Sequence, residues 1–254
     1  NAQERTIKEI SDDISFAKPM RRLVQGDVGS GKTVVAAVSM FISAKNNTQS
    51  VLLCPTEVLA EQHFKNFSVW FKNSNIKIEL LTGKMPISKR RGIYQDLEDG
   101  VIDILIGTHA VFQDKVKMKN LGLVVVDEQQ RFGVKQRFDL VKKSSDQIMP
   151  HQLFMTATPI PRTLAMTIFA DLETSKIDEL PPGRKPVETL VYSDKKKDEI
   201  VKRLETVCKL GNQVFWLCTM IEESENLDVQ AADEAKEWIK ENTNGLNIDL
   251  VHSK

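Results

Sequence analysis

Residues 26–33 read Gly26-Asp27-Val28-Gly29-Ser30-Gly31-Lys32-Thr33 and match the phosphate-binding pattern G-x-x-x-x-G-K-[ST] at every fixed position. Glycines let the backbone curl and aim its N–H groups at phosphate oxygens. Lys32 can place its ammonium on the β- and γ-phosphates, and the Thr33 hydroxyl can ligate Mg²⁺. A short strand over 23–25 and an apolar helix over 34–42 supply the expected context, since the helix dipole favours an anion. We therefore prefer a phosphate site to a glycine-rich turn without a ligand.

Composition limits the classes of protein that this chain can belong to. The 254 residues include 35 Lys+Arg and 35 Asp+Glu, so the net charge is zero, which argues against a globally basic nucleic-acid binder but leaves local patches open. No apolar run approaches the ~20 residues of a membrane span, and no signal peptide opens the chain. The absence of a first Met suggests an excised fragment. We expect a cytoplasmic protein whose cysteines, Cys54, Cys208 and Cys218, are buried and reduced.

Apolar segments alternate with helical patterns along the first two thirds of the chain. Helices are expected over 3–14, 34–42, 57–71 and 89–97, and strands over 23–25, 50–54, 76–81, 103–106, 121–126 and 151–155. The strands are continuously apolar, which indicates a parallel sheet covered on both faces. Right-handed crossovers then predict a doubly wound α/β domain.

A proline-rich segment over 181–186 marks the expected domain boundary, because it can continue neither a helix nor a central strand. We assign the first domain to residues 1–183 and an incomplete second α/β domain to residues 184–254. In the second, strands are expected over 187–192, 213–218 and 248–251, and helices over 194–210 and 231–241.

Asp127 and Glu128 directly follow the apolar strand at 121–126. A carboxylate at the end of a central strand lies in the crevice where α/β sheets bind ligands. Asp127 can hold Mg²⁺ together with Thr33, and Glu128 can orient and deprotonate an attacking water. The alternative is a solvated acidic turn, which the phosphate loop upstream makes less attractive.

Three further strand ends carry polar residues. The hydroxyls of Thr156 and Thr158 can hydrogen-bond the acidic pair and relay the nucleotide state, although Thr also suits the cap of a helix over 160–169. Pro55 and Thr56 follow one strand, and Gly107, Thr108 and His109 follow another. Their N–H groups and hydroxyls can hold nucleic-acid phosphates. Each of these signals is weak alone, and a lone His63 or His109 is more often an ordinary surface or core histidine.

Together these stretches resemble the motor motifs of superfamily 2 helicases. The motifs are GDVGSGKT, PTEVLAEQH, GTHA, VVVDEQQRFGV and TATPIPRT, and the longer segments resemble bacterial ATP-dependent helicases of branched DNA. The resemblance implies a RecA-like doubly wound sheet followed by the start of a second RecA-like domain, with ATP in the cleft between them. It implies that Gln3 reads the adenine edge, with ATP and Mg²⁺ as cofactors. Replication forks and Holliday junctions in recombination and repair are the implied substrates.

The chain departs from the family in two respects. Gln130 stands where the family usually has His, which affects the coupling role assigned to Gln130, Thr156 and Thr158. The later motor motifs, with their arginine for the γ-phosphate, are missing, as is a DNA-wedge domain before the motor. We expect slow turnover by this piece and a monomeric full-length protein. The alternatives are the motor of the transcription-repair coupling factor and a nucleotide-binding interaction domain without hydrolysis, against which intact Lys32, Asp127 and Glu128 argue.

Overall fold

The computed structural model describes residues 1–16, 18–128, 149–158, 172–179, 183–184, 187–218 and 225–251. The chain divides into two compact units, Asn1–Arg184 and Lys185–Lys254. The boundary expected after residue 183 falls beside this division. Of the proline-rich segment, Gly183 and Arg184 lie within the described residues.

Parallel strands form the sheet of the first unit. Among the described residues, seven strands lie in the order β3-β4-β2-β5-β6-β1-β7, and each adjacent pair is parallel. Their bounds are β1 Arg21–Gly26, β2 Gln49–Leu53, β3 Ile78–Leu81, β4 Ile104–Gly107, β5 Leu121–Val126, β6 His151–Thr156 and β7 Glu173–Ile177. The predicted doubly wound parallel sheet is therefore confirmed.

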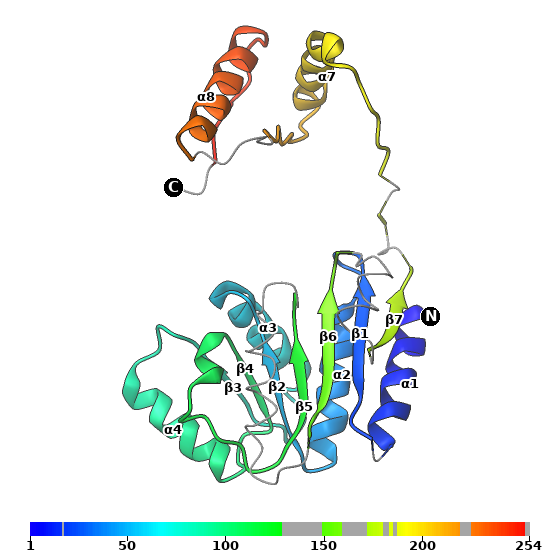
Figure 1. Cartoon of the computed structure of the whole chain (residues 1–254), viewed down its shortest axis with the longest axis vertical. Coiled ribbons are helices and arrows are strands. Elements are labelled where there is room, and N and C mark those ends of the chain that lie inside the picture. The colour runs from blue at the N-terminus through cyan, green and yellow to red at the C-terminus, as the bar shows by residue number, and fades with distance from the viewer. Residues whose placement is uncertain are drawn as a thin grey trace. The chain divides into compact units, whose positions relative to one another are not determined.

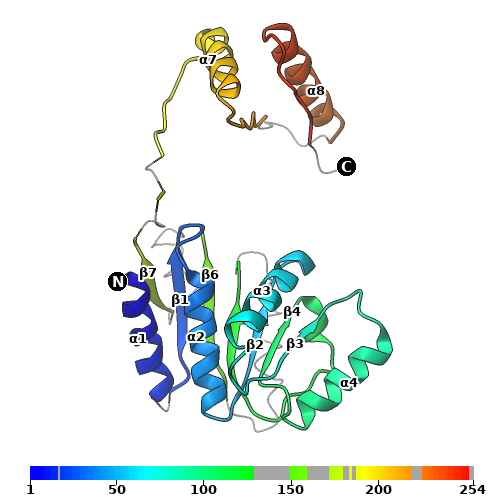
Figure 2. The same ribbon diagram turned by 180° about the vertical axis from the view of Figure 1, so that it is seen from behind.

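Successive residues of the central strands point into two separate apolar cores. One core joins strand residues such as Val24 and Leu52 to the helices α1 Ala2–Ser15, α2 Lys32–Lys45 and α3 Glu57–Trp70. The other joins Leu23 and Val51 to α4 Ile87–Glu98 and the short helix η1 His109–Phe112. Figure 1 shows the sheet with its labelled strands, and Figure 2 shows α1, α2 and α3 on the face seen from behind. Because both faces are covered, the strands can be apolar throughout.

The edge strand β7 was not expected from the sequence. It pairs with β1 over Arg22↔Glu173 to Gly26↔Ile177. Only Ser175 and Ile177 of its residues are buried, and the others are exposed. An edge strand with one covered face carries polar residues, so it lacks the continuous apolar run that marks the central strands.

In the second unit the described elements are helical. They are η3 Asp194–Lys196, α7 Lys197–Lys209 and α8 Glu225–Glu241, so both expected helices are confirmed. The strands expected over 187–192, 213–218 and 248–251 are wrong, since these segments are irregular. A strand forms only by pairing with another strand. The described residues of this unit provide no pairing partner for any of these three segments. Phe215 is accordingly 95% exposed, and Cys218 is exposed rather than buried as expected.

Candidate functional site

The phosphate loop joins the end of β1 to the start of α2. Gly29 and Gly31 have φ values of +79° and +94°, which side chains with a Cβ rarely adopt. A Cβ on Gly31 would also lie 2.0 Å from Nε2 of Gln3. The backbone conformation therefore requires both glycines, and a side chain at residue 31 would also displace the Gln3 amide.

Lys32 folds back over the loop. Its Nζ donates to the carbonyl oxygens of Gly26 at 2.7 Å and Asp27 at 2.9 Å. Burial lowers the pKa of Lys32, and the negative charges of Glu128, Asp127 and Asp27 oppose that shift. The acidic pair at the end of β5 thus lies close enough to the loop lysine to act on it electrostatically.

Gln3 also lies against the loop. Its Nε2 donates to the Ser30 carbonyl oxygen at 2.8 Å, so α1 is tied to the turn that precedes α2. This contact places the Gln3 side chain beside the phosphate loop, although the two are 27 residues apart in the sequence. The contact of Gln3 with adenine stays a prediction.

Arg184 is a loop contact that the sequence analysis missed. Its Nη1 lies 2.7 Å from Oδ2 of Asp27 and donates to the Val28 carbonyl oxygen at 3.1 Å. A hydrogen bond from the Val28 N–H, assisted by this guanidinium, lowers the pKa of Asp27. The segment that leads to the second unit therefore begins in contact with the phosphate loop.

The acidic pair has a constrained geometry. Asp127 is 9% exposed, its Oδ1 accepts from the Glu128 N–H at 3.0 Å, and its Oδ2 lies 2.9 Å from Nε2 of His63. Glu128 has a φ of +49°, an uncommon conformation for a residue with a side chain. Such strained positions cluster at functional sites. His63 is a second contact that the sequence analysis missed, having been interpreted as an ordinary histidine.

The end of β6 lies between the loop and the acidic pair. β6 pairs with β5 on one side and with β1 on the other, where Thr156 is opposite Gln25. Thr156 is fully buried, and its hydroxyl accepts from the Thr158 N–H at 3.1 Å. The two hydroxyl oxygens lie 3.0 Å apart. Gln130, the third residue assigned to coupling, lies outside the described residues.

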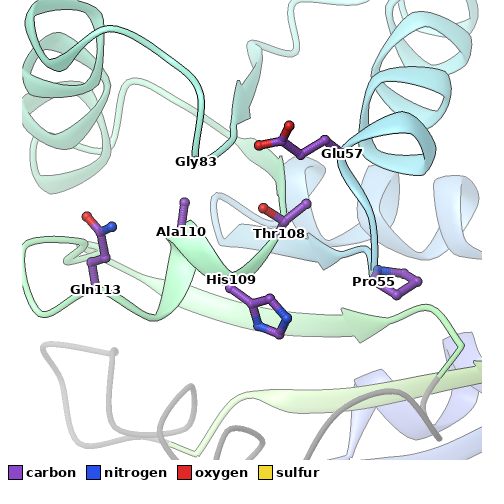
Figure 3. Close-up of a pocket in the computed structure, with 7 residues that line it drawn as sticks. All are labelled: Pro55, Glu57, Gly83, Thr108, His109, Ala110 and Gln113. Atoms are coloured by element: carbon purple, nitrogen blue, oxygen red, sulfur yellow. The ribbon is translucent and has the colours of Figure 1, made fainter. Parts of the chain in front are cut away.

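A pocket of about 400 Å³ opens at the ends of β2 and β4. Figure 3 shows the residues that line it: Pro55, Glu57, Gly83, Thr108, His109, Ala110 and Gln113. Three of the residues assigned to nucleic-acid phosphates, Pro55, Thr108 and His109, are therefore gathered around one hollow. Glu57 and Ala110 belong to the PTEVLAEQH and GTHA motifs, whereas Gly83 and Gln113 were not predicted from the sequence.

The other two assigned residues have local structural roles. Thr56 caps α3, with its hydroxyl accepting from the Leu59 N–H at 3.3 Å. Gly107 is buried at the end of β4, where a Cβ would lie 2.5 Å from the Leu81 carbonyl oxygen. Close packing, rather than a surface contact, accounts for this glycine.

The donors present suit a Mg·nucleotide. Mg²⁺ keeps several waters and binds through one or two protein oxygens together with phosphates. The Thr33 hydroxyl and the Asp127 carboxylate beside a glycine cradle are such a set. Among the described residues, no group of three or more His, Cys, Asp or Glu side chains could hold a metal by itself. Within the same residues, no helix is both long and apolar enough to cross a membrane.

Comparison with known proteins gives the class. Residues 1–167 match the model of the DEAD/DEAH box helicase family, and the chain belongs to this family. A DEAD box protein from Methanococcus jannaschii shares the fold, with a TM-score of 0.54 at 19% identity over 94% of this chain and 63% of that one.

Several curated relatives and one solved structure are helicases of one kind. The chain is 48% identical over 256 residues to the ATP-dependent DNA helicase RecG of Haemophilus influenzae, and 48% identical over 253 residues to that of Aquifex aeolicus. These matches cover 100% of this chain but 37% and 32% of those relatives. RecG bound to a three-way DNA junction gives a TM-score of 0.77 at 37% identity, over 95% of this chain and 31% of that one. The resemblance to a RecG-type helicase is thereby confirmed. The chain spans about a third of the length of these relatives.

Proposed function

We propose that this chain is the ATP-binding part of a RecG-type helicase that uses ATP hydrolysis to remodel branched DNA. The observation that carries the proposal is that Lys32, Asp127 and Glu128 lie near one another beside a glycine loop, at the carboxyl ends of the central strands. The RecG relatives, described as ATP-dependent DNA helicases, support it. We also propose that the full-length protein is a monomer in the bacterial cytoplasm.

Each residue of the site has a defined task. The loop N–H groups and Lys32 bind the phosphates, while Thr33 and Asp127 would hold Mg²⁺. Bound Mg²⁺ would neutralise charge on the β- and γ-phosphates. Glu128 orients the attacking water and accepts its proton. Gln3, on α1, is proposed to contact the adenine, since an amide offers one donor and one acceptor. Thr156 and Thr158 are proposed to relay the nucleotide state of the site.

The second contact surface is the pocket at the ends of β2 and β4. Thr108 and His109, which line this pocket together with Pro55, are proposed to bind DNA phosphates there through hydroxyl, ring and backbone N–H groups. Glu57 would repel a phosphate, but Lys84 pairs with it, Nζ to Oε2, at 3.0 Å. The hydrogen bond from Lys84 lowers the pKa of Glu57, so this carboxylate stays charged and engaged with its partner. Sequence-independent DNA contacts of this kind suit a protein that recognises junction shape.

Glu128→Gln in the full-length protein tests the assignment of the catalytic base. The amide keeps the shape of the side chain but cannot accept a proton, so we expect nucleotide binding to persist and hydrolysis to be lost. Steady-state ATPase rates and calorimetric ADP titrations measure the two effects. Glu98→Gln, the same change at an exposed position of α4, is the matched control. Hydrolysis at the parental rate by the Glu128 variant would show that another residue is the base.

The substrate class is tested by comparing DNA structures. ATPase rates of the full-length protein are measured with single-stranded, duplex and forked DNA at one salt concentration, because phosphate contacts are salt-dependent. We expect the largest stimulation with forked DNA. Equal rates with all three would contradict a branched-DNA helicase, and nucleotide binding without any turnover would favour an interaction domain.

A further inference from the structure

His63 links a helix on one face of the sheet to the acidic pair. It lies on α3, and its Nε2 is 2.9 Å from Oδ2 of Asp127. His63 is 7% exposed and Asp127 is 9% exposed, so the contact is shielded from water. A shielded hydrogen bond to a carboxylate is stronger and more directional than an exposed one.

The surroundings of the ring indicate which nitrogen carries the proton. Nδ1 of His63 is buried and has no hydrogen-bond partner among the described residues. A buried N–H without an acceptor costs more than a bare ring nitrogen, and the Asp127 carboxylate can only accept when ionised. We therefore assign the proton to Nε2, which donates to Oδ2 of Asp127.

Asp127 is thus held at both oxygens. Oδ1 accepts from the Glu128 N–H at 3.0 Å, and Oδ2 accepts from His63. Two donors from different elements fix the rotation of a carboxylate far better than one donor does. Each oxygen also keeps a lone pair that can be offered to a cation.

We propose that His63 is a positioning residue that orients the Asp127 carboxylate for Mg²⁺ bound with the nucleotide. The proposal rests on the function proposed above and deepens it at the same site. Groups that hydrogen-bond a ligating side chain commonly change metal affinity 10- to 100-fold when removed. His63 would act through Asp127 and would not touch the nucleotide itself.

A purely structural role for His63 is the competing interpretation. The ring also packs edge-on against Phe67, with centroids 6.3 Å apart and planes at 72°. Phe67 is fully buried on the same helix but belongs to the apolar core. If His63 served only to fill space, Phe67→Leu and His63→Leu would have the same consequences. This makes Phe67→Leu the matched control.

The test uses Mn²⁺ as the probe in the full-length protein. Free Mn²⁺ is followed by electron paramagnetic resonance in the presence of ADP, and ADP binding in EDTA is measured separately. His63→Leu keeps similar volume but no donor, so we expect Mn²⁺ affinity to fall roughly 10-fold or more while ADP affinity in EDTA is unchanged. His63→Gln retains an N–H donor at about the reach of Nε2 and should restore Mn²⁺ affinity to within roughly threefold of the parent. Phe67→Leu should leave it near the parental value.

Several outcomes would overturn the proposal. Parental Mn²⁺ affinity in a folded His63→Leu protein would do so, as would an equal loss in Phe67→Leu. If His63→Leu does not fold, His63→Gln and His63→Asn decide, because the shorter Asn side chain cannot place its donor where Nε2 lies. Equal Mn²⁺ affinity in those two variants overturns the positioning role. A parent protein that binds no ADP would instead contradict the proposed function, so the two failures are distinguishable.

Discussion

Lys32 is the side chain whose removal should weaken nucleotide binding most directly. Its ammonium is half-buried at the loop and can make a charge-assisted contact to phosphate. Lys32→Ala should therefore cost about 1.5–3 kcal/mol of binding free energy, or roughly 10- to 150-fold in affinity. Titration calorimetry with ADP measures this, with Lys45→Ala at the far end of α2 as control. Unchanged affinity in the Lys32 variant would contradict the loop assignment.

The cysteines should differ sharply in reactivity. Burial raises the pKa of the Cys54 thiol, with a further contribution from the nearby Asp127 charge, so almost no thiolate forms at neutral or mildly alkaline pH. Cys218 is exposed. Timed iodoacetamide labelling at pH 8 followed by mass spectrometry should modify Cys218 first and Cys54 only on unfolding. Early modification of Cys54 in folded protein would show that the chain opens locally just after the end of β2.

Contiguity decides which site residues could be predicted. The glycine loop and the Asp127-Glu128 pair could be predicted because the residues of each motif are adjacent in the sequence. His63 and Arg184 could not be found in this way. Each acts through one contact with a residue far away in the sequence, at 2.9 Å and 2.7 Å, and neither lies in a local pattern that specifies that partner.

Helices and strands were predictable where burial leaves a strong pattern. β5 was expected over 121–126 and is found there, because continuous apolar residues mark a strand covered on both faces. β7 is mostly polar and exposed and therefore leaves no such pattern. The strand predicted over 213–218 is the opposite case: the segment is apolar, but it is irregular because apolar residues alone cannot form a strand without a pairing partner.

The docking of α1 provides a test of element packing. Arg22 of β1 is 6% exposed, lies 2.7 Å from Oδ2 of Asp13 on α1, and donates to the Ser175 hydroxyl of β7 at 2.8 Å. Arg22→Met keeps much of the volume but leaves Asp13 without its partner. We expect a loss of about 1–3 kcal/mol in the free energy of unfolding, measured by urea denaturation.

Arg5→Gln is the matched control for this prediction. Arg5 also joins α1 to the region of β7, through Asp178 at 3.0 Å, but both side chains are more than half exposed. Exposed pairs contribute little, so unfolding should be nearly unchanged. Equal effects of the two substitutions would mean that burial does not set the strength of the α1 contacts.

The first unit contains every described residue of the proposed nucleotide site. Its sheet brings Gly26, Asp127 and Thr156 to one edge because β1, β5 and β6 are parallel and end there together. Both apolar cores also belong to residues before 184. The described residues that we propose to bind phosphate therefore all lie in this unit, as does Arg184, which contacts Asp27.

Residues 1–184 should consequently fold and bind ADP without the second unit. We expect the truncated chain to unfold cooperatively in urea and to bind Mg·ADP within roughly threefold of the 254-residue chain, because every described residue of the proposed site lies in the first unit. A threefold change in affinity corresponds to less than about 1 kcal/mol of binding free energy. Circular dichroism and titration calorimetry on both chains make the comparison. Removing Arg184 as well, in residues 1–183, controls for its contact with the loop. A truncated chain that folds but binds Mg·ADP more than tenfold weaker would show that residues 185–254 contribute directly to the nucleotide site.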